Sequence, residues 1–541
     1  MIMNKVGSSM VLAGAALIGW SSLCAQQKPA APVAGIQQQG GRGGQGGGGG
    51  RGGGRASQML FDAQCSGCHG GSDGTLGRAP NLFDSKWLGT VSDSDIQKLV
   101  RDGIPNTEMQ GFSATQVNDQ QLFELTAFLR TASTNFEPKI EFVADPDGKV
   151  INSEKQKFRI EVLTRDLKTP FGLAFLPDGR LLITERDGDI RIYNKGKLSD
   201  PVTNTPKPNV QQDGGYLDIT VHPQYARHGW IYLSYSEVLP GWTPPPPDAN
   251  PPTPGAAAGG QGGGGGRGRG PQIPSNTVIV RGKINAQNEW TDNQVIFRSP
   301  EKLYATTAVH YGSRFLWDKQ DHLFFTLGER GTMQSAQDII GNSLGKIHRI
   351  NDDGSAPKDN PFYNKEGADK TIWSYGHRNP EGLAWDPVTG KLWESEHGPT
   401  GGDEINIIQP GHNYGWGVIS NGVQPGITER EHEGMEQPIV YYTPAIAPAG
   451  ISFYTGDKYP GWKNTSLFVG ALKGQQLRRL EINGDKVTHQ EVVFNAFGRV
   501  RDIIQGADGY FYIALQNPTG VNGIPLAAST PGLLIRLMPE K

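Results

Sequence analysis

The sequence predicts two folded domains, a small all-helical domain followed by a large all-β domain built as a six-bladed propeller. Its length of 541 residues exceeds what one hydrophobic core usually organises. Residues 57–133 space their apolar side chains as helices do. Residues 158–541 consist of short β-branched and aromatic runs separated by Asp-Gly and Pro-Asp turns. The fold class is therefore multidomain, all-α followed by all-β.

A repeated strand pattern predicts the propeller. Several runs share a turn residue followed by an apolar strand, and removing one inserted loop brings their longest interval close to the length of a propeller blade. Six such units indicate six blades of four short strands around a central channel, with a pair of β-sandwiches as the alternative. The runs are GRLLITERDG from Gly179, GWIYLSYSE from Gly229, HLFFTLGERG from His322, GKLWESEHG from Gly390, SLFVGALKG from Ser466 and GYFYIALQN from Gly509.

The first residues resemble an export signal. Residues 1–25 combine a positive charge at Lys5, an apolar run and a small residue, Ala25, at a suitable cleavage point. The apolar run is too short to span a bilayer, and Leu23 disfavours lipid attachment at Cys24. We therefore expect a periplasmic protein whose mature chain has no transmembrane segment.

Three segments lack the pattern of folded elements. Residues 26–56 contain a Gly-rich tract and should form a flexible linker. Residues 134–157 should connect the domains, and 238–275 form a Pro/Gly-rich loop inserted into the β domain. An RGG-type nucleic-acid-binding segment is the alternative for the first tract, but it lacks interleaved aromatic residues. The formal net charge of −3 also gives no reason to expect nucleic acid as a partner.

The helical domain carries the run CSGCH, in which Cys65 and Cys68 precede His69. Such a run can attach haem c through two thioethers while the adjacent imidazole binds the iron. A zinc site is the first alternative, but the next histidine is His222, far into the other domain. A thiol-redox motif is the second, but no βαβ pattern surrounds the run. Met109 follows in a Pro-containing loop, and the whole domain resembles a class I cytochrome c, which implies His69 and Met109 as axial iron ligands.

The large domain contains a set of motifs rich in polar residues. They are TPFGLAFLPDGRLLITER, AVHYGSR, DNPF, SYGHRNPEGLAW, SEHGPTGGDEINII, NYGW, ALKG and GRVRD. Through these motifs, most of the domain resembles the pyrroloquinoline-quinone (PQQ)-dependent aldose sugar dehydrogenases, relatives of soluble glucose dehydrogenase. The resemblance implies a six-bladed propeller that holds PQQ over its channel, in agreement with the strand repeat.

This resemblance implies catalytic roles for three residues. His310 corresponds to the general base that takes the proton of the sugar's anomeric hydroxyl as hydride passes to the quinone. Glu329 corresponds to the carboxylate that orients this imidazole, although the family generally has the shorter Asp there. Arg378 would stabilise negative charge that develops on the quinone oxygen.

Cofactor contacts follow from the same resemblance. Arg378, Asn379, Lys473, Arg499 and Arg501 correspond to residues that hold PQQ. The cofactor carries three carboxylates, so converging cations suit it chemically. Without the resemblance, these lysine and arginine side chains would be expected to be solvated at the surface.

The resemblance also implies calcium. The backbone carbonyls of Gly398 and Pro399 correspond to ligands of a calcium ion beside the cofactor, where a hard cation would polarise a quinone carbonyl. Glu404 and the carbonyl of Tyr414 correspond to a second, structural calcium site. From the residues alone, HGPTGG reads as a turn.

Two acidic residues depart from the family pattern near the substrate. Asp213 corresponds to a position near the substrate and PQQ where relatives usually carry Gln. The resemblance therefore implies that Asp213 contacts the substrate or PQQ. Glu381 is likewise Gln in many relatives. The preferred sugar therefore does not follow from the resemblance.

We expect a quinohaemoprotein that oxidises aldoses at the anomeric carbon to lactones. It would pass the electrons one at a time through haem c to an external acceptor, either a cytochrome or a respiratory chain component. One alternative is a PQQ-dependent dehydrogenase of another sugar-derived aldehyde or polyol. The other is a non-enzymatic carbohydrate-binding propeller tethered to an electron carrier.

Overall fold

The computed structural model describes residues 52–71, 77–88, 91, 93–105, 107–133, 142–244, 273–516 and 532–540. The predicted signal peptide, most of the N-terminal linker and the middle of the inserted loop lie outside these ranges. Among the described residues, no helix is both long and apolar enough to cross a membrane.

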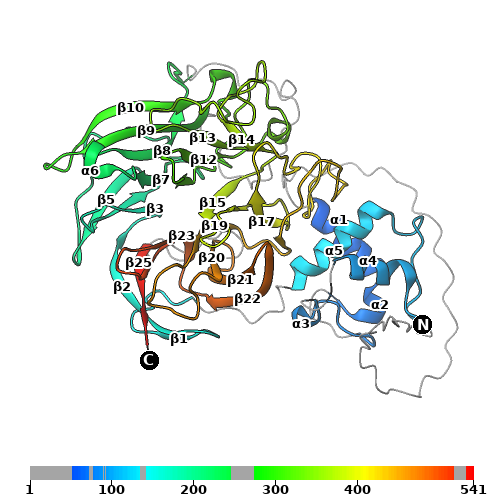
Figure 1. The fold of residues 1–541 in the computed structure, drawn as a ribbon. Coiled ribbons are helices and arrows are strands. Elements are labelled where there is room, and N and C mark those ends of the chain that lie inside the picture. Colours follow the sequence, from blue (N-terminus) through cyan, green and yellow to red (C-terminus); the bar gives the residue numbers. More distant parts are fainter. Residues whose placement is uncertain are drawn as a thin grey trace, which may run out of the picture. The chain divides into compact units, whose positions relative to one another are not determined.

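The N-terminal unit is helical (Figure 1). Its helices are α1 (Gly52–Gln64), α2 (Ser66–His69), α3 (Ser85–Leu88), α4 (Asp93–Asp102) and α5 (Asp119–Ser133). The first of them begins inside the segment predicted as a flexible linker. Asn118 caps α5, because its side-chain oxygen accepts the Gln121 N–H at 2.8 Å while the Gln121 side chain accepts the Asn118 N–H at 3.0 Å.

Apolar residues of α1 and α5 meet in the core of this unit. Phe61, Leu125 and Leu129 are buried together with Phe83, and the rings of Phe61 and Phe83 lie 4.8 Å apart. Burying each large apolar side chain contributes about 1.5–3 kcal/mol. The predicted helical face of α5 thus packs against the helix that leads into the CSGCH run.

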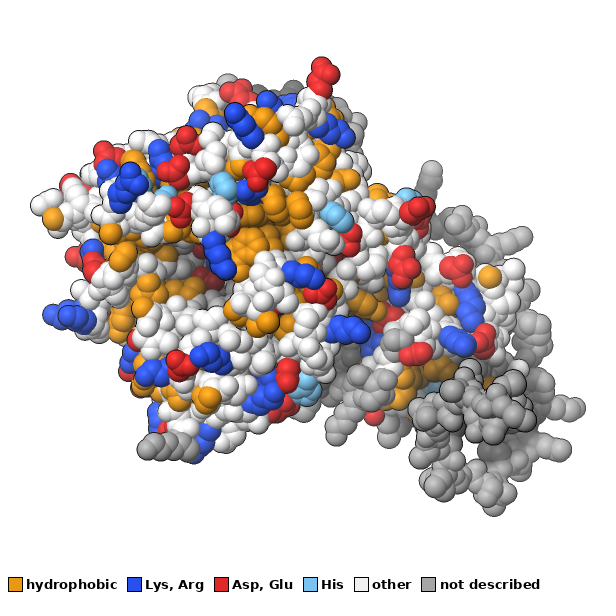
Figure 2. Space-filling model, viewed as in Figure 1, with side chains coloured by type: hydrophobic (Ala, Val, Ile, Leu, Met, Phe, Trp, Pro, Cys, Tyr) orange, Lys and Arg blue, Asp and Glu red, His pale blue; other side chains and the backbone are white. Residues whose placement is uncertain are grey.

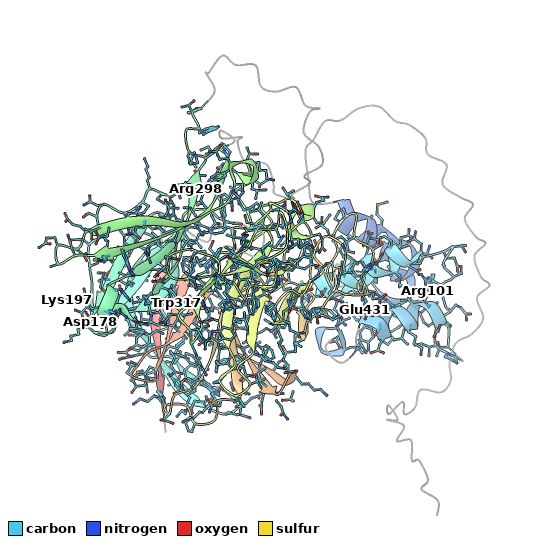
Figure 3. All side chains as sticks on the ribbon, turned by 45° about the horizontal axis from the view of Figure 1, so that its top comes forward. Arg101, Asp178, Lys197, Arg298, Trp317 and Glu431 are labelled. Atoms are coloured by element: carbon cyan, nitrogen blue, oxygen red, sulfur yellow. The ribbon has the colours of Figure 1, made fainter. Side chains whose placement is uncertain are left out.

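Arg101 lies on α4 of the helical unit (Figure 3). Its contacts fix the end of the loop that contains Met109. Its guanidinium donates to the carbonyls of Phe112 at 3.1 Å and Val117 at 2.5 Å and pairs with Asp119 at 2.6 Å. The loop is thereby held at its end against the start of α5.

The β domain consists of six antiparallel sheets in the part of the chain that the structure describes, which confirms the six-bladed propeller (Figure 1). Five blades use four consecutive strands each. They are β3 (Pro170–Phe175), β4 (Leu181–Glu185), β5 (Asp189–Asn194) and β6 (Lys197–Leu198); β7 (Tyr216–Val221), β8 (Ile231–Val238), β9 (Ser275–Ile284) and β10 (Trp290–Arg298); β11 (Phe315–Trp317), β12 (Leu323–Leu327), β13 (Lys346–Ile350) and β14 (Ile372–Tyr375); β15 (Pro380–Trp385), β16 (Leu392–Glu396), β17 (Asp403–Ile408) and β18 (Val440–Tyr442); and β19 (Pro448–Phe453), β20 (Ser466–Ala471), β21 (Gln476–Asn483) and β22 (Lys486–Phe494). Short helical turns α6 (Tyr225–His228), η1 (Glu301–Leu303) and η2 (Met333–Ala336) lie between strands.

The sixth blade joins the two ends of the domain. Its strand order is β1-β2-β25-β24-β23. The strands are β1 (Val150–Asn152), β2 (Lys157–Leu167), β23 (Arg499–Gln505), β24 (Phe511–Gln516) and β25 (Gly532–Pro539). Pairing of β2 with β25 runs from Phe158 opposite Pro539 to Leu167 opposite Gly532. β1 lies within the segment predicted as an interdomain linker, so the propeller begins earlier than the predicted residue 158.

The first strand of each blade lies next to the axis, because β3, β7, β11, β15, β19 and β23 contact one another in that order around the ring. Glycine permits this close approach at two places. A Cβ on Gly172 would lie 2.4 Å from the carboxylate of Asp218, and a Cβ on Gly450 would lie 2.4 Å from that of Asp502. No other residue fits there without moving a neighbouring blade.

A buried arginine ties three blades together at the axis. Nη1 of Arg314 lies 3.1 Å from Asp218 on β7 and 3.0 Å from Asp502 on β23. The same carboxylates accept the backbone N–H groups of Phe315 at 2.7 Å and Leu173 at 3.0 Å. The charges are thus paired and hydrogen-bonded, as buried charges must be.

On the surface of the propeller, hydrophobic side chains gather around a hollow (Figure 2).

Candidate functional site

The loop before β11 and the turn after β12 bring His310 and Glu329 together. Nδ1 of His310 lies 2.5 Å from Oε1 of Glu329, and the two side chains are 18% and 3% exposed. A carboxylate only accepts hydrogen bonds, so Nδ1 carries the proton and Nε2 keeps a free lone pair. The longer Glu thus reaches the imidazole in this chain.

The environment keeps His310 neutral. Burial, followed by the positive charge of Arg378, lowers the pKa of the imidazole below its ordinary value, and the contact with Glu329 only partly opposes this. At neutral pH, His310 is therefore unprotonated at Nε2. It has the protonation state that a general base requires.

Arg378 lies between β14 and β15, and the backbone on both sides fixes it. Its N–H donates to Glu396 at 2.7 Å and its carbonyl accepts the N–H of Glu329 at 2.9 Å. Its guanidinium donates to the carbonyl of His397 at 3.1 Å and lies over the ring of Trp416 at 5.2 Å. Nε is buried and has no hydrogen-bond partner in the described part of the chain. Arg378 thus retains a buried donor for a further acceptor.

Asn379 links the base loop to the next strand. Its side-chain oxygen accepts the N–H of Gly312 at 3.1 Å, and its amide nitrogen donates to Glu381 at 2.9 Å. The same nitrogen lies 3.3 Å from Nδ1 of His397. All of these groups lie near the point where β15 starts.

Arg499 and Arg501 come from β23 and approach the same region. Arg501 pairs with Glu381 and lies 4.4 Å over the ring of Phe171. Burial, and then the charge of Arg501, lowers the pKa of Arg499 to about 10, while Glu381 and Asp213 oppose that shift. The cations Arg499 and Arg501 therefore lie near the carboxylates of Glu381 and Asp213. Nε of Arg501 is another buried donor that lacks a partner within the described ranges.

Asp213 and Lys473 lie at the edge of this region and are exposed. The N–H of Asp213 donates to the carbonyl of Ala308 at 3.0 Å, which places it beside the loop that leads to His310. The N–H of Lys473 donates to the carbonyl of Ile446 at 2.9 Å. Within the described part of the chain, neither side chain forms an ion pair with Arg378 or Arg501.

A buried aspartate pins the loop that contains Gly398. Asp403 accepts the N–H groups of Gly398 at 2.8 Å, Ile446 at 2.6 Å and Ala447 at 2.6 Å. The loop therefore has a fixed backbone, as a site made of carbonyl ligands needs. Because the N–H of Lys473 is bound to Ile446, the same carboxylate also connects this loop to the Lys473 turn.

The residues predicted for both calcium sites line one cavity. Its lining residues include Arg378, Glu396, His397, Gly398, Pro399, Glu404, Tyr414 and Trp416. The two predicted calcium sites therefore lie on the walls of one space, next to the predicted catalytic arginine.

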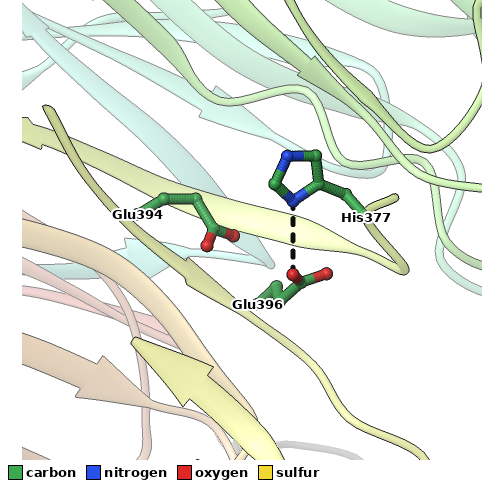
Figure 4. A group of neighbouring side chains, drawn as sticks. All are labelled: His377, Glu394 and Glu396. Atoms are coloured by element: carbon green, nitrogen blue, oxygen red, sulfur yellow. Dashed lines mark hydrogen bonds and ion pairs between the residues drawn. The ribbon is translucent and has the colours of Figure 1, made fainter. Parts of the chain in front are cut away.

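Three buried side chains form a cluster that includes Glu396, one of the residues lining this cavity (Figure 4). His377, Glu394 and Glu396 offer ligand atoms within 4.8 Å of one another, and Nδ1 of His377 lies 3.2 Å from Glu396. Burial and then the charge of Glu396 raise the pKa of Glu404 to about 8, and the same two causes raise the pKa of Glu394. Oε1 of Glu394 is buried without a hydrogen-bond partner among the described residues. Tyr414 stacks on His377 at 4.7 Å.

The CSGCH run lies where α1 meets α2. Nδ1 of His69 lies 2.7 Å from the carbonyl of Pro80, so the ring directs its proton to the backbone and keeps Nε2 available for a metal. Cys65 and Cys68 are free thiols. The N–H of Ile104 donates to the carbonyl of Met109 at 2.9 Å, which closes the Met109 loop on itself.

Comparison with known proteins identifies the β domain. The family described as Glucose / Sorbosone dehydrogenase matches residues 167–523. The chain belongs to this family. It is therefore an oxidoreductase, and its helical unit matches Cytochrome C oxidase, cbb3-type, subunit III over residues 53–129. This member of the glucose/sorbosone dehydrogenase family thus carries a fused cytochrome c domain, as the sequence predicts.

Named relatives and a solved structure agree with this family assignment. The chain is 38% identical over 371 residues to Aldose sugar dehydrogenase YliI from Escherichia coli, covering 67% of this chain and 91% of that protein. It is 26% identical over 449 residues to Quinoprotein glucose dehydrogenase B from Acinetobacter calcoaceticus, covering 68% and 87%. The structure of the soluble aldose sugar dehydrogenase from Escherichia coli in its apo-form matches with a TM-score of 0.59 and 35% identity, covering 71% and 100%.

Two residues that organise this site were not predicted from the sequence. Asp403 fixes the Gly398 loop, and Glu396 fixes the backbone of Arg378. Both lie inside the motif SEHGPTGGDEINII. An acidic residue in an otherwise apolar strand needs a buried partner, and that signal was available in the sequence.

Proposed function

We propose that this glucose/sorbosone dehydrogenase oxidises an aldose at its anomeric carbon, uses PQQ as the first electron acceptor and passes the electrons to haem c in the same chain. The observation that carries this proposal is the neutral His310 held by Glu329 beside the buried donors of Arg378 and Arg501. The lactone is the product expected from oxidation of an anomeric hydroxyl.

The residues present fit PQQ. Nε of Arg378 and Nε of Arg501 are buried donors without partners in the described ranges, and the three carboxylates of PQQ are suitable acceptors. Arg499, Lys473 and Asn379 would complete the binding site. When bound, PQQ supplies a quinone that accepts two electrons.

Three residues of this chain would act in the reaction. Nε2 of His310 takes the proton from the anomeric hydroxyl, and Glu329 stabilises the imidazolium that forms. Arg378 lies close enough for its charge to act on His310 and would stabilise negative charge that develops on the acceptor's oxygen. The low exposure of Glu329 keeps water away from its contact with His310 and strengthens it.

The residues present also fit calcium. The cavity offers backbone oxygens of Gly398 and Pro399 and the carboxylate of Glu404, which are ligands for a hard cation. Oε1 of Glu394 is buried without a hydrogen-bond partner among the described residues, and burial followed by the charge of Glu396 raises the pKa of Glu404 to about 8. A cation bound there would stabilise the charged forms of these crowded carboxyl groups. Glu404 and the carbonyl of Tyr414 would hold the structural ion.

Haem c fits the helical unit. The free thiols of Cys65 and Cys68 are available for thioethers, and the bond from His69 to Pro80 orients the ring for iron. Met109 would be the second axial ligand. The predicted export signal and the need to attach haem covalently support a periplasmic location, where an external acceptor in the respiratory chain would take the electrons.

The test is optical. The haem-containing chain is reconstituted with calcium and PQQ, a panel of aldoses is added, and the haem absorption bands are followed. Reduction is expected with at least one aldose, and His310→Ala should abolish it. His412→Ala is the matched control, because His412 is an exposed histidine paired with Glu436. A haem that stays oxidised with every sugar would refute the proposal.

Two further measurements separate the remaining functions. A haem reduction rate that does not depend on protein concentration supports transfer within one chain, and a rate proportional to concentration contradicts it. Product analysis distinguishes a lactone from the product of another sugar-derived aldehyde or a polyol. Sugar binding without any reduction would indicate a carbohydrate-binding propeller.

A further inference from the structure

Arg330 follows Glu329 directly and is only 1% exposed. Its guanidinium donates to backbone carbonyls: Nη1 to Val309, and Nη2 to Thr307 at 2.6 Å and to Ser275 at 3.1 Å. Among the described residues, no carboxylate forms a hydrogen bond or ion pair with it. Burying a charge is expensive, so this arrangement requires a reason other than a salt bridge.

The face of the guanidinium also has a defined contact. It lies 3.5 Å over the ring of Tyr311, a separation at which a cation is attracted to an aromatic face. The hydroxyl of Tyr311 is 2.8 Å from that of Ser275. In return, the hydroxyl of Thr307 donates to the carbonyl of Arg330. Arg330 therefore contacts the residues on both sides of His310 and is itself held by the same loop.

His310 needs such support. Its φ is +55°, and that of Arg330 is +56°. This left-handed region costs residues with a side chain about 1–2 kcal/mol each, and such conformations persist where the surrounding structure enforces them. Glu329 fixes the imidazole ring, but it does not fix the backbone that carries the ring.

We propose that Arg330 is a positioning residue that holds the backbone of the 307–311 loop so that His310 meets Glu329 and the substrate in one geometry. The catalytic part of this inference rests on the proposed function of His310. Glu329 and Arg330 thus form a pair of adjacent residues, one of which orients the ring while the other orients the loop.

The chemistry of arginine suits this task. A planar guanidinium can donate in several fixed directions and stack on a ring at the same time, whereas lysine offers a point charge on a flexible stem. Arg330→Lys keeps the charge and some donors, and Arg330→Met removes all donors at similar length. Lysine should therefore restore part of what methionine loses.

The experiment compares Arg330→Met, Arg330→Lys and the control Arg349→Met. Arg349 is 6% exposed, contacts Asp318 and Asp359 and lies on β13, away from the His310 loop. A loss of positioning by about 1 Å costs on the order of 100-fold in rate. We expect kcat to fall about 10- to 100-fold in Arg330→Met and less in Arg330→Lys, with KM and the Kd of PQQ changed less than about threefold.

A second readout does not depend on turnover. Diethyl pyrocarbonate modifies neutral imidazoles, and the rate at His310 can be followed by mass spectrometry of the peptide. We expect faster modification of His310 in both Arg330 variants and an unchanged rate in Arg349→Met, which should lower only Tm.

An Arg330→Lys protein with unchanged kcat and an unchanged modification rate overturns the inference, as does an Arg330→Met protein that loses only Tm. If the wild type oxidises no sugar, the proposed function fails, and the modification rates alone still decide whether Arg330 holds the loop. If Arg330→Met does not fold, Arg330→Lys carries both measurements.

Discussion

The contact between His310 and Glu329 leads to a quantitative prediction for Glu329→Gln. The substitution keeps the shape of the side chain and removes its charge. In the wild type, Nδ1 and Oε1 are 2.5 Å apart and the carboxylate is 3% exposed, so the bond is short, charge-assisted and shielded from water. Its loss should be felt when the imidazole becomes positively charged.

The magnitude follows from the bond. A hydrogen bond to a charged group contributes about 1.5–3 kcal/mol, and each 1.36 kcal/mol corresponds to tenfold in rate. Glu329→Gln should therefore lower kcat about 10- to 150-fold. Glu329→Asp should lower kcat to a similar extent, because the side chain is shorter by one carbon–carbon bond of about 1.5 Å.

The assay is sugar-dependent haem reduction at saturating PQQ, with kcat and KM measured separately. Glu436→Gln is the control, because Glu436 makes a similar contact of 2.7 Å to Nδ1 of His412 on the surface. That pair is 43% and 36% exposed, and exposed pairs contribute little. If both Glu329 variants keep kcat within about twofold of the wild type, the imidazole is not stabilised by this carboxylate.

Three further outcomes are expected. Because burial and Arg378 lower the pKa of His310, the base form should persist below pH 6.5, and kcat should fall only as the pH drops through that lowered value; a midpoint above 6.5 contradicts this. Glu381→Gln should lower Tm, because it breaks a buried pair with Arg501, while tightening PQQ binding about tenfold or more as one negative charge leaves the site; weaker binding in a titration followed by fluorescence contradicts this. Calcium should raise Tm of the wild type, and Glu404→Gln should reduce that increase; equal increases would exclude Glu404 as a ligand.

The sequence predicts the blade count well for a physical reason. The six runs identified as strands correspond to β4, β8, β12, β16, β20 and β24, the second strand of each blade. These strands are covered on both faces by neighbouring blades, as the fully buried run from Leu181 to Glu185 illustrates, so their sequences are almost continuously apolar. Outer strands such as β22 alternate exposed and buried residues and give a weaker signal.

Non-local contacts account for what the sequence did not predict. Arg314 meets Asp218 and Asp502 only because the ring brings β7 and β23 to the axis. Glu329 is next to Arg330 in the sequence but forms no ion pair with it in the described structure, and the carbonyl acceptors of Arg330 come from two other segments. Spacing along the sequence cannot show which backbone carbonyls a buried guanidinium will find.

The pairing of β2 with β25 determines where the chain can be truncated without disrupting the propeller. β2, the second strand after the cytochrome c domain, pairs with β1 on one side and with the C-terminal strand β25 on the other, so both ends of the β domain close the ring. A propeller produced without the haem unit should therefore begin upstream of Val150, where β1 starts. Removing the last strand, Gly532–Pro539, should release β2 and open the ring, so a deletion at either end is a test of assembly as well as of activity.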